Sequence, residues 1–504
     1  MQQLCCANYG VADSKPAGFI NSQVIMTLIN RPFASQATYK VKPVSQALAL
    51  LLFFWGQPTI SQAEALDEGS TVGRSGVVTP SGNPMLLAPF IYIPPTGANK
   101  SQQVEAEHPK RSADQQRIVD LNAAAKYQAV GTEGLALMAK EEVDAQLQLI
   151  VANSLAWTGR LKEAVPTYQG LAKGELANEA NIGLANIYRW RGRDDQAAPM
   201  YRAVLAAAPD NSDAQEGLAL TSRELSPKTT LSFGGATDSS ETVRRSATIN
   251  HRWRDTGGSN IMEIETSAVR DELPTAAAGQ QEVSFRYQNL GLELKPSFKL
   301  SMPTKTDSSV YGSVRIQLLE DQVSLEGGRV NWGRMVVNPN ALAAHLSASH
   351  AGISASHSFE YGNLSGNLNY YDISDGNVVQ TGGLQFSSAW RPIGNNLKPF
   401  VGIETRSARF NTSSYWSPVD GSGALFAGIL GEWGAADWNI FASAQSGTRL
   451  YGDAGQSWSL SAGGKRWLST DVAISLNLWS MASTRDNATY RASSAAVNLE
   501  KLWR

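Results

Sequence analysis

The sequence predicts an α+β multidomain protein in which a short solenoid of paired helices precedes a transmembrane antiparallel β-barrel of about 14–16 strands, with 16 preferred. Three observations predict this fold class. A helical sequence repeat lies within residues 113–226, and short runs of alternating apolar and polar residues fill residues 227–504. An apolar run of signal-peptide length precedes both regions.

The apolar run QALALLLFFWG covers residues 46–56 and follows a segment that carries Arg and Lys. It is too short to cross a bilayer as a helix, which takes about 20 residues. Ala63 and Ala65 supply the small residues of a signal-peptidase site. We therefore expect residues 1–65 to be a signal peptide with an N-terminal extension, and Met26 is a plausible true start. A buried core helix is the alternative.

Composition argues against several kinds of function. Both cysteines, Cys5 and Cys6, lie in the predicted signal region, so the exported chain would hold no disulfide, thiolate metal site or cysteine nucleophile. The formal net charge of −2 leaves no basic footprint for a nucleic-acid partner. Residues 66–112 are rich in Pro, Gly, Ser and Thr, and we expect them to form a linker.

An internal repeat runs through the helical region. AWTGRLKEAVPTYQGL at 156–171 aligns with RWRGRDDQAAPMYRAV at 189–204, and a second block that begins at Ala180 returns at Ala214. The residues that recur are expected to pack neighbouring helices together: Trp157, Gly159, Ala164, Tyr168, Trp190, Gly192, Ala197 and Tyr201. A helical repeat of about 34 residues resembles the tetratricopeptide repeat. Two or three such units would dock a periplasmic protein partner on a concave surface, or would act as a passive cap.

The period of the sequence changes to two after Pro227. In DVAISLNLW, residues 471–479, apolar and polar side chains alternate strictly, which is typical of a strand with one apolar face. The other face of these runs is small and polar. Because lipid cannot hydrogen-bond an open strand edge, a sheet in a membrane must close into a barrel, and we expect Leu476 to face lipid. Tryptophans near the ends of the runs are candidates for interfacial girdles: Trp253, Trp390, Trp433, Trp438, Trp467, Trp479 and Trp503.

Two stretches of the predicted barrel, YYDISDGN at 370–377 and SSYWSPVDG at 414–422, look like the strand-to-loop signatures of exopolysaccharide export porins. This family includes the poly-β-1,6-N-acetylglucosamine export porin and cellulose synthase operon protein C. The resemblance covers residues 113–504 and implies periplasmic tetratricopeptide repeats, an outer-membrane barrel surrounded by lipid, export of a sugar polymer, and periplasmic protein partners for the repeats. This chain departs from the family pattern in having room for fewer repeats and in ending on Arg504 after the final aromatic residue.

Polar and aromatic residues in the two stretches are candidates for contact with a sugar chain at the mouth of the barrel. They are Asp372, Asp375, Asn377, Tyr415 and Trp416. The alternative interpretation is that Asp-Gly-Asn is simply a tight turn and that Trp416 belongs to a girdle. Glu263 and Glu265 share one face of a predicted strand, and we expect them to be lumen carboxylates or solvated rim charges.

The histidines of the barrel region do not indicate an enzyme. If residues 341–361 are extended, His345 and His350 point to opposite faces, and His345 and His357 lie about 40 Å apart at about 3.3 Å per residue. Such residues form neither a catalytic pair nor a metal site, so we expect no enzymatic activity, cofactor or metal. The alternative to export is a receptor or structural anchor whose barrel is plugged.

Overall fold

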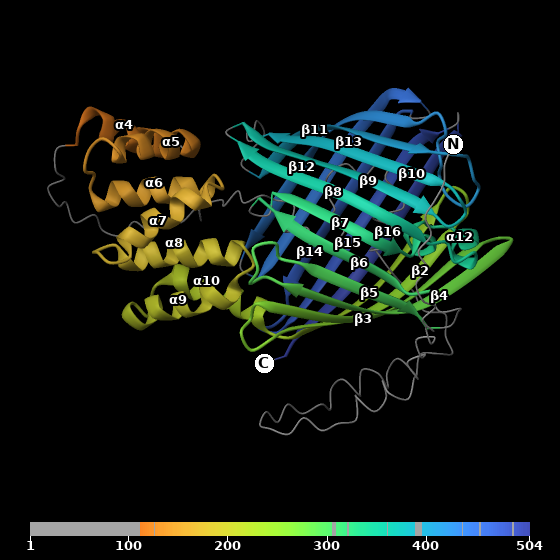
Figure 1. Ribbon diagram of the computed structural model, residues 1–504, viewed down its shortest axis with the longest axis horizontal. Coiled ribbons are helices and arrows are strands. Elements are labelled where there is room, and N and C mark those ends of the chain that lie inside the picture. Colours follow the sequence, from red (N-terminus) through yellow and green to blue (C-terminus); the bar gives the residue numbers. More distant parts are fainter. Residues whose placement is uncertain are drawn as a thin grey trace, which may run out of the picture. The chain divides into compact units, whose positions relative to one another are not determined.

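The computed structural model describes residues 111–503 apart from 125, 305–308, 320–321, 360, 389–395, 436, 453–454 and 486–487. The predicted signal peptide and nearly all of the predicted linker lie outside the described residues. Within the described residues, a helical region precedes a closed barrel of 16 antiparallel strands (Figure 1). The predicted fold class and the preferred strand number are therefore confirmed. In this part of the chain, no helix is long and apolar enough to span a bilayer.

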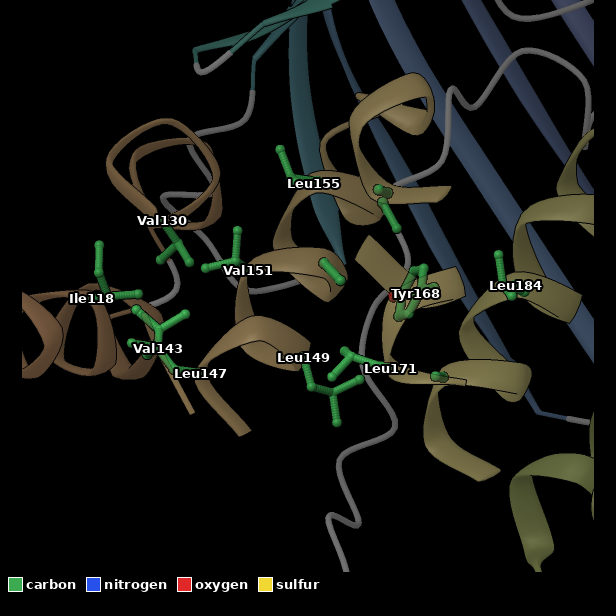
Figure 2. Close-up of a cluster of buried hydrophobic side chains, with 14 of the residues drawn as sticks. Ile118, Val130, Val143, Leu147, Leu149, Val151, Leu155, Tyr168, Leu171 and Leu184 are labelled. Atoms are coloured by element: carbon green, nitrogen blue, oxygen red, sulfur yellow. The ribbon is translucent and has the colours of Figure 1, made fainter. Parts of the chain in front are cut away.

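The helical region consists of seven described helices, three of which begin with a side-chain cap. Its helices are α4 (Ala113–Ala123), α5 (Tyr127–Met138), α6 (Ala145–Trp157), α7 (Leu161–Leu171), α8 (Ala177–Trp190), α9 (Asp194–Ala207) and α10 (Ser212–Leu225). Ser112 forms a capping box with Gln115 at the start of α4, and Asp144 and Asn211 accept amide hydrogen bonds at the starts of α6 and α10. Buried side chains of α4 to α8 form one apolar cluster (Figure 2).

The sequence repeat corresponds to a repeated contact between a tyrosine and a glycine. Tyr168 of α7 packs against Gly183 of α8, where an added Cβ would lie 2.4 Å from the tyrosine ring. The Tyr168 hydroxyl also donates a hydrogen bond to Asn153 Oδ1 at 2.6 Å. Tyr201 repeats both contacts one unit later, with an asparagine of α8 and a glycine of α10. Glycine is required because any larger residue would overlap the ring.

The other recurring residues also occupy equivalent places. Gly159 and Gly192 follow α6 and α8 with φ angles of +80° and +72°. These angles lie in the left-handed region, which glycine adopts readily because it has no Cβ. Ala164 and Ala197 are fully buried in α7 and α9. The two tryptophans of the repeat stand at the ends of α6 and α8 and are half-buried. The repeated residues thus define where each helix ends and how closely the next one approaches.

We predict that Gly183→Ala lowers the free energy of unfolding of the helical region by about 1–3 kcal/mol, because the added methyl group forces the Tyr168 ring to move. Gly170→Ala is the matched control: it lies in α7 with no atom within 4 Å of its added Cβ, so it should be neutral or stabilising. Thermal unfolding of the full chain in detergent, followed by circular dichroism at a helix-sensitive wavelength, measures both. Equal effects of the two substitutions would contradict the tyrosine–glycine contact.

The barrel closes on itself without a free edge. Its strands are β1 (Lys228–Asp238), β2 (Val243–Arg254), β3 (Asn260–Leu273), β4 (Ala276–Asn289), β5 (Ser297–Pro303), β6 (Tyr311–Leu318), β7 (Val323–Val330), β8 (Ala348–Phe359), β9 (Gly362–Ile373), β10 (Val378–Ser388), β11 (Leu397–Ala408), β12 (Ser422–Ala435), β13 (Trp438–Gly452), β14 (Ser457–Trp467), β15 (Val472–Arg485) and β16 (Ala488–Leu502). Each strand pairs with its sequence neighbours, and β16 pairs with β1 over the full length of β1. Every strand edge is therefore hydrogen-bonded, as lipid requires.

The outer face of the barrel is apolar. Leu476 and Leu478 of β15 are 44% and 46% exposed, and Val497 of β16, which pairs with Leu476, is 43% exposed. Ser475 lies on the inner face, where its hydroxyl accepts a hydrogen bond from Asn498 at 2.9 Å. The large exposed side chains of neighbouring strands thus form an outward belt suited to lipid.

Two predicted girdle residues lie elsewhere. Trp467, the last residue of β14, shares the inner face with Lys465, whose ammonium group lies 4.8 Å from the Trp467 ring centroid. Trp433 and Trp503 are 39% and 38% exposed near strand ends, as a girdle requires, but Trp479 is 9% exposed and faces inward. The expectation for Trp479 was wrong because β15 continues to Arg485, which places this tryptophan in mid-strand with inward parity. Trp390 lies outside the described residues.

We predict that Leu476→Arg impairs assembly of the barrel, because an arginine facing lipid near the midplane costs about 2–4 kcal/mol. Ser475→Arg, one residue away on the inner face, should assemble at close to the natural level. Heat-modifiability on a gel and abundance in the outer-membrane fraction report the difference. Similar abundance of the two variants would contradict the assignment of the faces.

Residues 341–361 are not one extended segment. α12 (Pro339–Ala343) occupies its start, with the Asn338 side chain as cap and Pro339 at the first turn, and β8 begins only at Ala348. His345 lies between them with a φ of +51°. The condition under which the histidine spacing was considered is therefore not met, because local capping residues favour a helix there.

Candidate conduit and the segment that crosses it

The inner face of the barrel carries the polar and charged residues of the strands. Glu263 and Glu265 of β3 lie on the face opposite Ile264, which is 46% exposed on the outside. Glu263 Oε1 is 3.5 Å from the guanidinium of Arg286 on β4, and Glu265 accepts a hydrogen bond from Asn250 Nδ2 at 3.5 Å. Both carboxylates therefore line the lumen.

The connection between β7 and β8 folds into the lumen and is called the crossing segment, residues 331–347. It contains α11 (Trp332–Met335) and α12. Arg244 of β2 donates hydrogen bonds to the carbonyl oxygens of Arg334 at 2.8 Å and Val336 at 2.6 Å. The same guanidinium forms a two-pronged ion pair with Asp271 of β3, with both distances 2.7 Å. Both side chains are completely buried.

Three further hydrogen bonds fix the crossing segment to the same wall. Arg334 donates to the hydroxyl of Ser267 on β3 at 2.8 Å. Asn331 donates to Gln280 at 2.9 Å and to Glu282 at 3.1 Å, both on β4. Three neighbouring strands, β2, β3 and β4, therefore hold residues 331–336 by hydrogen bonds. The polar groups that form these bonds are buried, and a buried polar group without a hydrogen-bond partner lowers stability.

The other side of the crossing segment packs on a different wall through apolar and aromatic contacts. The Trp332 ring centroid lies 4.9 Å from that of Tyr371 on β9 and 5.5 Å from that of Tyr415. Val379 of β10 and Ala408 of β11 belong to the same buried cluster. Since β3 and β10 are seven strands apart in a barrel of 16, the segment passes from one wall to nearly the opposite wall.

We predict that the double variant Arg244→Ala with Asp271→Ala frees the crossing segment and raises the conductance of the barrel in a planar bilayer. Removing both partners avoids a buried unpaired charge, which alone would cost about 3–5 kcal/mol. Arg245→Ala is the matched control, because this neighbouring arginine is 37% exposed on the other face of β2. A properly assembled double variant with natural conductance would show that the segment does not limit passage.

Four of the five predicted mouth residues meet in two adjacent connections, residues 374–377 and 409–421. The Tyr415 hydroxyl donates to Asp375 Oδ2 at 2.7 Å. Asn377 is fully buried, donates to the carbonyl of residue 410 and accepts from the amides of residues 409 and 410. Trp416 contributes its carbonyl to Arg406, whose guanidinium lies 5.5 Å from the Trp416 ring centroid. These residues therefore bind the two connections together.

Asp372 is placed differently from the other four. It lies on the exposed face of β9, between Tyr371 and Ile373, which are buried on the inner face.

Burial raises the pKa of Tyr415 well above its usual range, so its hydroxyl stays protonated and donates to Asp375. The Asp-Gly-Asn sequence is also a turn, since Gly376 has a φ of +89°.

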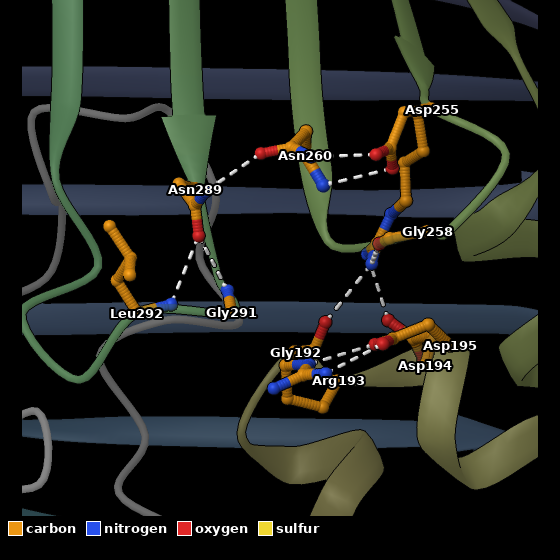
Figure 3. A network of polar contacts seen from close by, with 11 residues as sticks. Gly192, Arg193, Asp194, Asp195, Asp255, Gly258, Asn260, Asn289, Gly291 and Leu292 are labelled. Atoms are coloured by element: carbon orange, nitrogen blue, oxygen red, sulfur yellow. Dashed lines mark hydrogen bonds and ion pairs between the residues drawn. The ribbon is translucent and has the colours of Figure 1, made fainter.

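Charged residues connect the helical region to the turn between β2 and β3 (Figure 3). Arg254 at the end of β2 donates to Asp194 of α9 at 2.9 Å and to the carbonyl of Gly192 at 3.1 Å. An added Cβ on Gly258 would lie 2.6 Å from Asp195, so glycine permits this close approach.

Burial raises the pKa of Asp194 to about 6, and Arg254 opposes that rise. Asp194 is therefore mainly ionised at neutral pH and takes up a proton as the pH falls through about 6.

Sequence reasoning missed the residues that anchor the crossing segment. Arg244, Asp271 and Arg334 carry no recognisable motif. The signal that was available is parity, because Arg244 and Asp271 stand on the polar side of their alternating runs. Parity places a charge in the lumen but does not identify what it binds there. Among the described residues, no three His, Cys, Asp or Glu side chains are placed to hold a metal ion.

Comparison with known proteins concerns the barrel. No protein-family profile and no curated protein matches the sequence. Three similar solved structures are a bacterial polysaccharide outer membrane secretin (10% identity, TM-score 0.44, 56% of this chain and 99% of that chain), OccK11 (OpdR) of Pseudomonas aeruginosa (9%, 0.33, 55% and 96%) and a mutant of the Rh. blastica porin (12%, 0.28, 55% and 99%). At such identities the likeness concerns the fold alone.

A closed antiparallel barrel with a continuous apolar outer belt is stable only where lipid surrounds it. The inner face is polar, and the helices are joined to one end of the strands through residues 226 and 227. The chain is an outer-membrane β-barrel with an N-terminal helical region outside the barrel.

Proposed function

We propose that this protein exports an exopolysaccharide from the periplasm through the lumen of its barrel. The observation that carries the proposal is a closed barrel whose inner face offers hydroxyl and amide groups. Ser443 and Ser461 bond to each other at 2.7 Å, and Ser475 bonds to Asn498. Such groups exchange hydrogen bonds with sugar hydroxyls, and repeated weak contacts keep a chain moving. The mouth connections at 374–377 and 409–421 would form the exit.

The helical region would receive the polymer or its biosynthetic proteins. Its repeat geometry is that of stacked helix pairs, which commonly present a surface to another protein. The ion pair between Arg254 and Asp194 would hold this surface at the periplasmic end of the barrel. Under this proposal the repeats are tetratricopeptide-like docking units, and residues 1–65 direct export of the chain.

A second candidate function is a receptor or structural anchor with a plugged barrel. The crossing segment favours it, because residues 331–347 contact two walls of the lumen that are far apart in strand order. Export requires this segment to move aside or to leave enough room for a sugar chain. An anchor requires neither.

We predict that deletion of the gene leaves polymer synthesis intact and traps polymer in the periplasm. Trp416→Ala should lower export roughly two- to tenfold without changing barrel abundance, since an aromatic stacking contact is worth about 0.5–1.5 kcal/mol. Asp372→Ala is the matched control, because it lies on the exposed outer face of β9. Polysaccharide in the periplasm and in the medium is measured by lectin or antibody binding.

Reconstituted in a planar bilayer, the exporting protein should conduct ions and show brief blockades when a neutral oligosaccharide such as maltohexaose is added. Normal extracellular polysaccharide in the deletion strain, together with a reconstituted barrel that maltohexaose never blocks, would favour the plugged anchor.

A further inference from the structure

Three cations stand together on the inner wall of consecutive strands β4, β5 and β6. Arg286 pairs directly with Lys299 in the strand register, and Arg315 lies two residues beyond Ser313, the partner of Lys299. The residues next to them, Phe285, Phe298 and Val314, are 43%, 47% and 44% exposed on the outer face. Because side chains alternate along a strand, the three cations therefore share the lumen face.

The two arginines of this group have partners, whereas the central lysine does not. Arg286 lies 3.5 Å from Glu263, and Arg315 donates to Ser324 at 2.7 Å. Lys299 forms no ion pair or hydrogen bond within the part of the chain that the structure describes. Like charges directly opposite each other in an antiparallel pair repel, so Arg286 and Lys299 raise the free energy of the folded state.

Other lumen lysines are neutralised. Lys398 of β11 forms an ion pair with Glu432, and Lys465 of β14 forms one with Glu500 at 2.9 Å. An unpaired ionisable group within a membrane-spanning segment is costly and commonly marks the path of an ion or substrate. Lys299 differs from the other two lysines in having no carboxylate partner among the described residues, so its charge is open to an anion from outside.

We propose that Arg286, Lys299 and Arg315 form a binding station for anionic groups carried by the passing sugar polymer. Cations that line a pore favour anions and phosphates, and guanidinium groups bind carboxylate and phosphate in a forked geometry. The inference rests on the proposed export function and narrows its substrate to an acidic polysaccharide, with carboxylate, phosphate or sulfate substituents. Glu263 on β3 and Glu326 on β7 flank the station and keep the binding of each anionic group weak enough for release.

The station lies in the half of the lumen that contains the C-terminal ends of β4 and β6, whereas the crossing segment contacts the opposite half of the neighbouring strands. Arg315 is three residues from the end of β6 at Leu318, and Arg286 is three residues from the end of β4 at Asn289. Arg244 and Asp271, which hold the segment, stand near the opposite ends of β2 and β3. The station therefore meets a polymer that enters from the helical side before the crossing segment does.

The test is a binding measurement on the full chain in detergent, with hexagalacturonate as the acidic probe and maltohexaose as the neutral probe. Titration calorimetry at 0.05 M and 0.5 M NaCl should show stronger binding of the acidic probe at low salt, since salt screens charge contacts. Lys299→Gln should weaken binding of hexagalacturonate by about tenfold, equal to about 1.4 kcal/mol. Lys398→Gln is the matched control, because it removes the same charge from the same lumen at a lysine that already has a partner. It should leave binding of the acidic probe nearly unchanged.

Equal binding of the two probes, or an effect of Lys398→Gln as large as that of Lys299→Gln, would overturn the anion station. If maltohexaose still blocks the reconstituted barrel in that case, the export function stands and its polymer is neutral. If neither sugar blocks the barrel, the export function itself fails. Lys299→Arg keeps a positive charge at this position of β5. If this variant binds hexagalacturonate as strongly as the natural protein does, while Lys299→Gln does not, the result supports the station independently.

Discussion

The requirement that every backbone hydrogen bond be made inside lipid determines the rest of this structure. It forces β16 to pair with β1, and closure fixes which side chains face outward and which face the lumen. Leu476 is on the lipid side and Ser475 on the inner side because of that closure, not because of any contact that either residue makes alone. The same parity puts Arg244, Asp271, Glu263 and Lys299 inside, where the first three form ion pairs.

The lumen is therefore both the polar interior of the barrel and the place where its costliest interactions occur. Arg244 forms an ion pair with Asp271 and also donates hydrogen bonds to two carbonyl oxygens of the crossing segment. The opposite side of that segment packs through the rings of Trp332, Tyr371 and Tyr415. One side is thus held by directional hydrogen bonds and the other by apolar packing, so the two sides respond differently to the removal of charge and of aromatic rings.

The helical region depends on glycines that allow close packing and helix termination. Glycines at 183 and 217 admit tyrosine rings, and glycines at 159 and 192 let helices end in the left-handed conformation. Gly192 has a second role, since its carbonyl accepts a hydrogen bond from Arg254 of the barrel. A residue of the repeat therefore also helps to join the two regions, together with the buried ion pair of Arg254 and Asp194.

The sequence by itself determined the features that depend on local periodicity: the strand-rich barrel region, the outward parity of Leu476, the shared face of Glu263 and Glu265, and the equivalence of the repeat residues. It also singled out Asp372, Asp375, Asn377, Tyr415 and Trp416 as candidates, of which the structure places the last four in two adjacent connections. Tertiary structure alone decided which groups Arg244 binds. They are Asp271, 27 positions away in the sequence, and the carbonyls of residues 334 and 336, which are 90 and 92 positions away. It also decided that Trp479 faces inward and that Asp372 faces outward. The physical reason is that period and capping are set by adjacent residues, whereas partners across a closed barrel are set by register and by the path of a loop through the lumen.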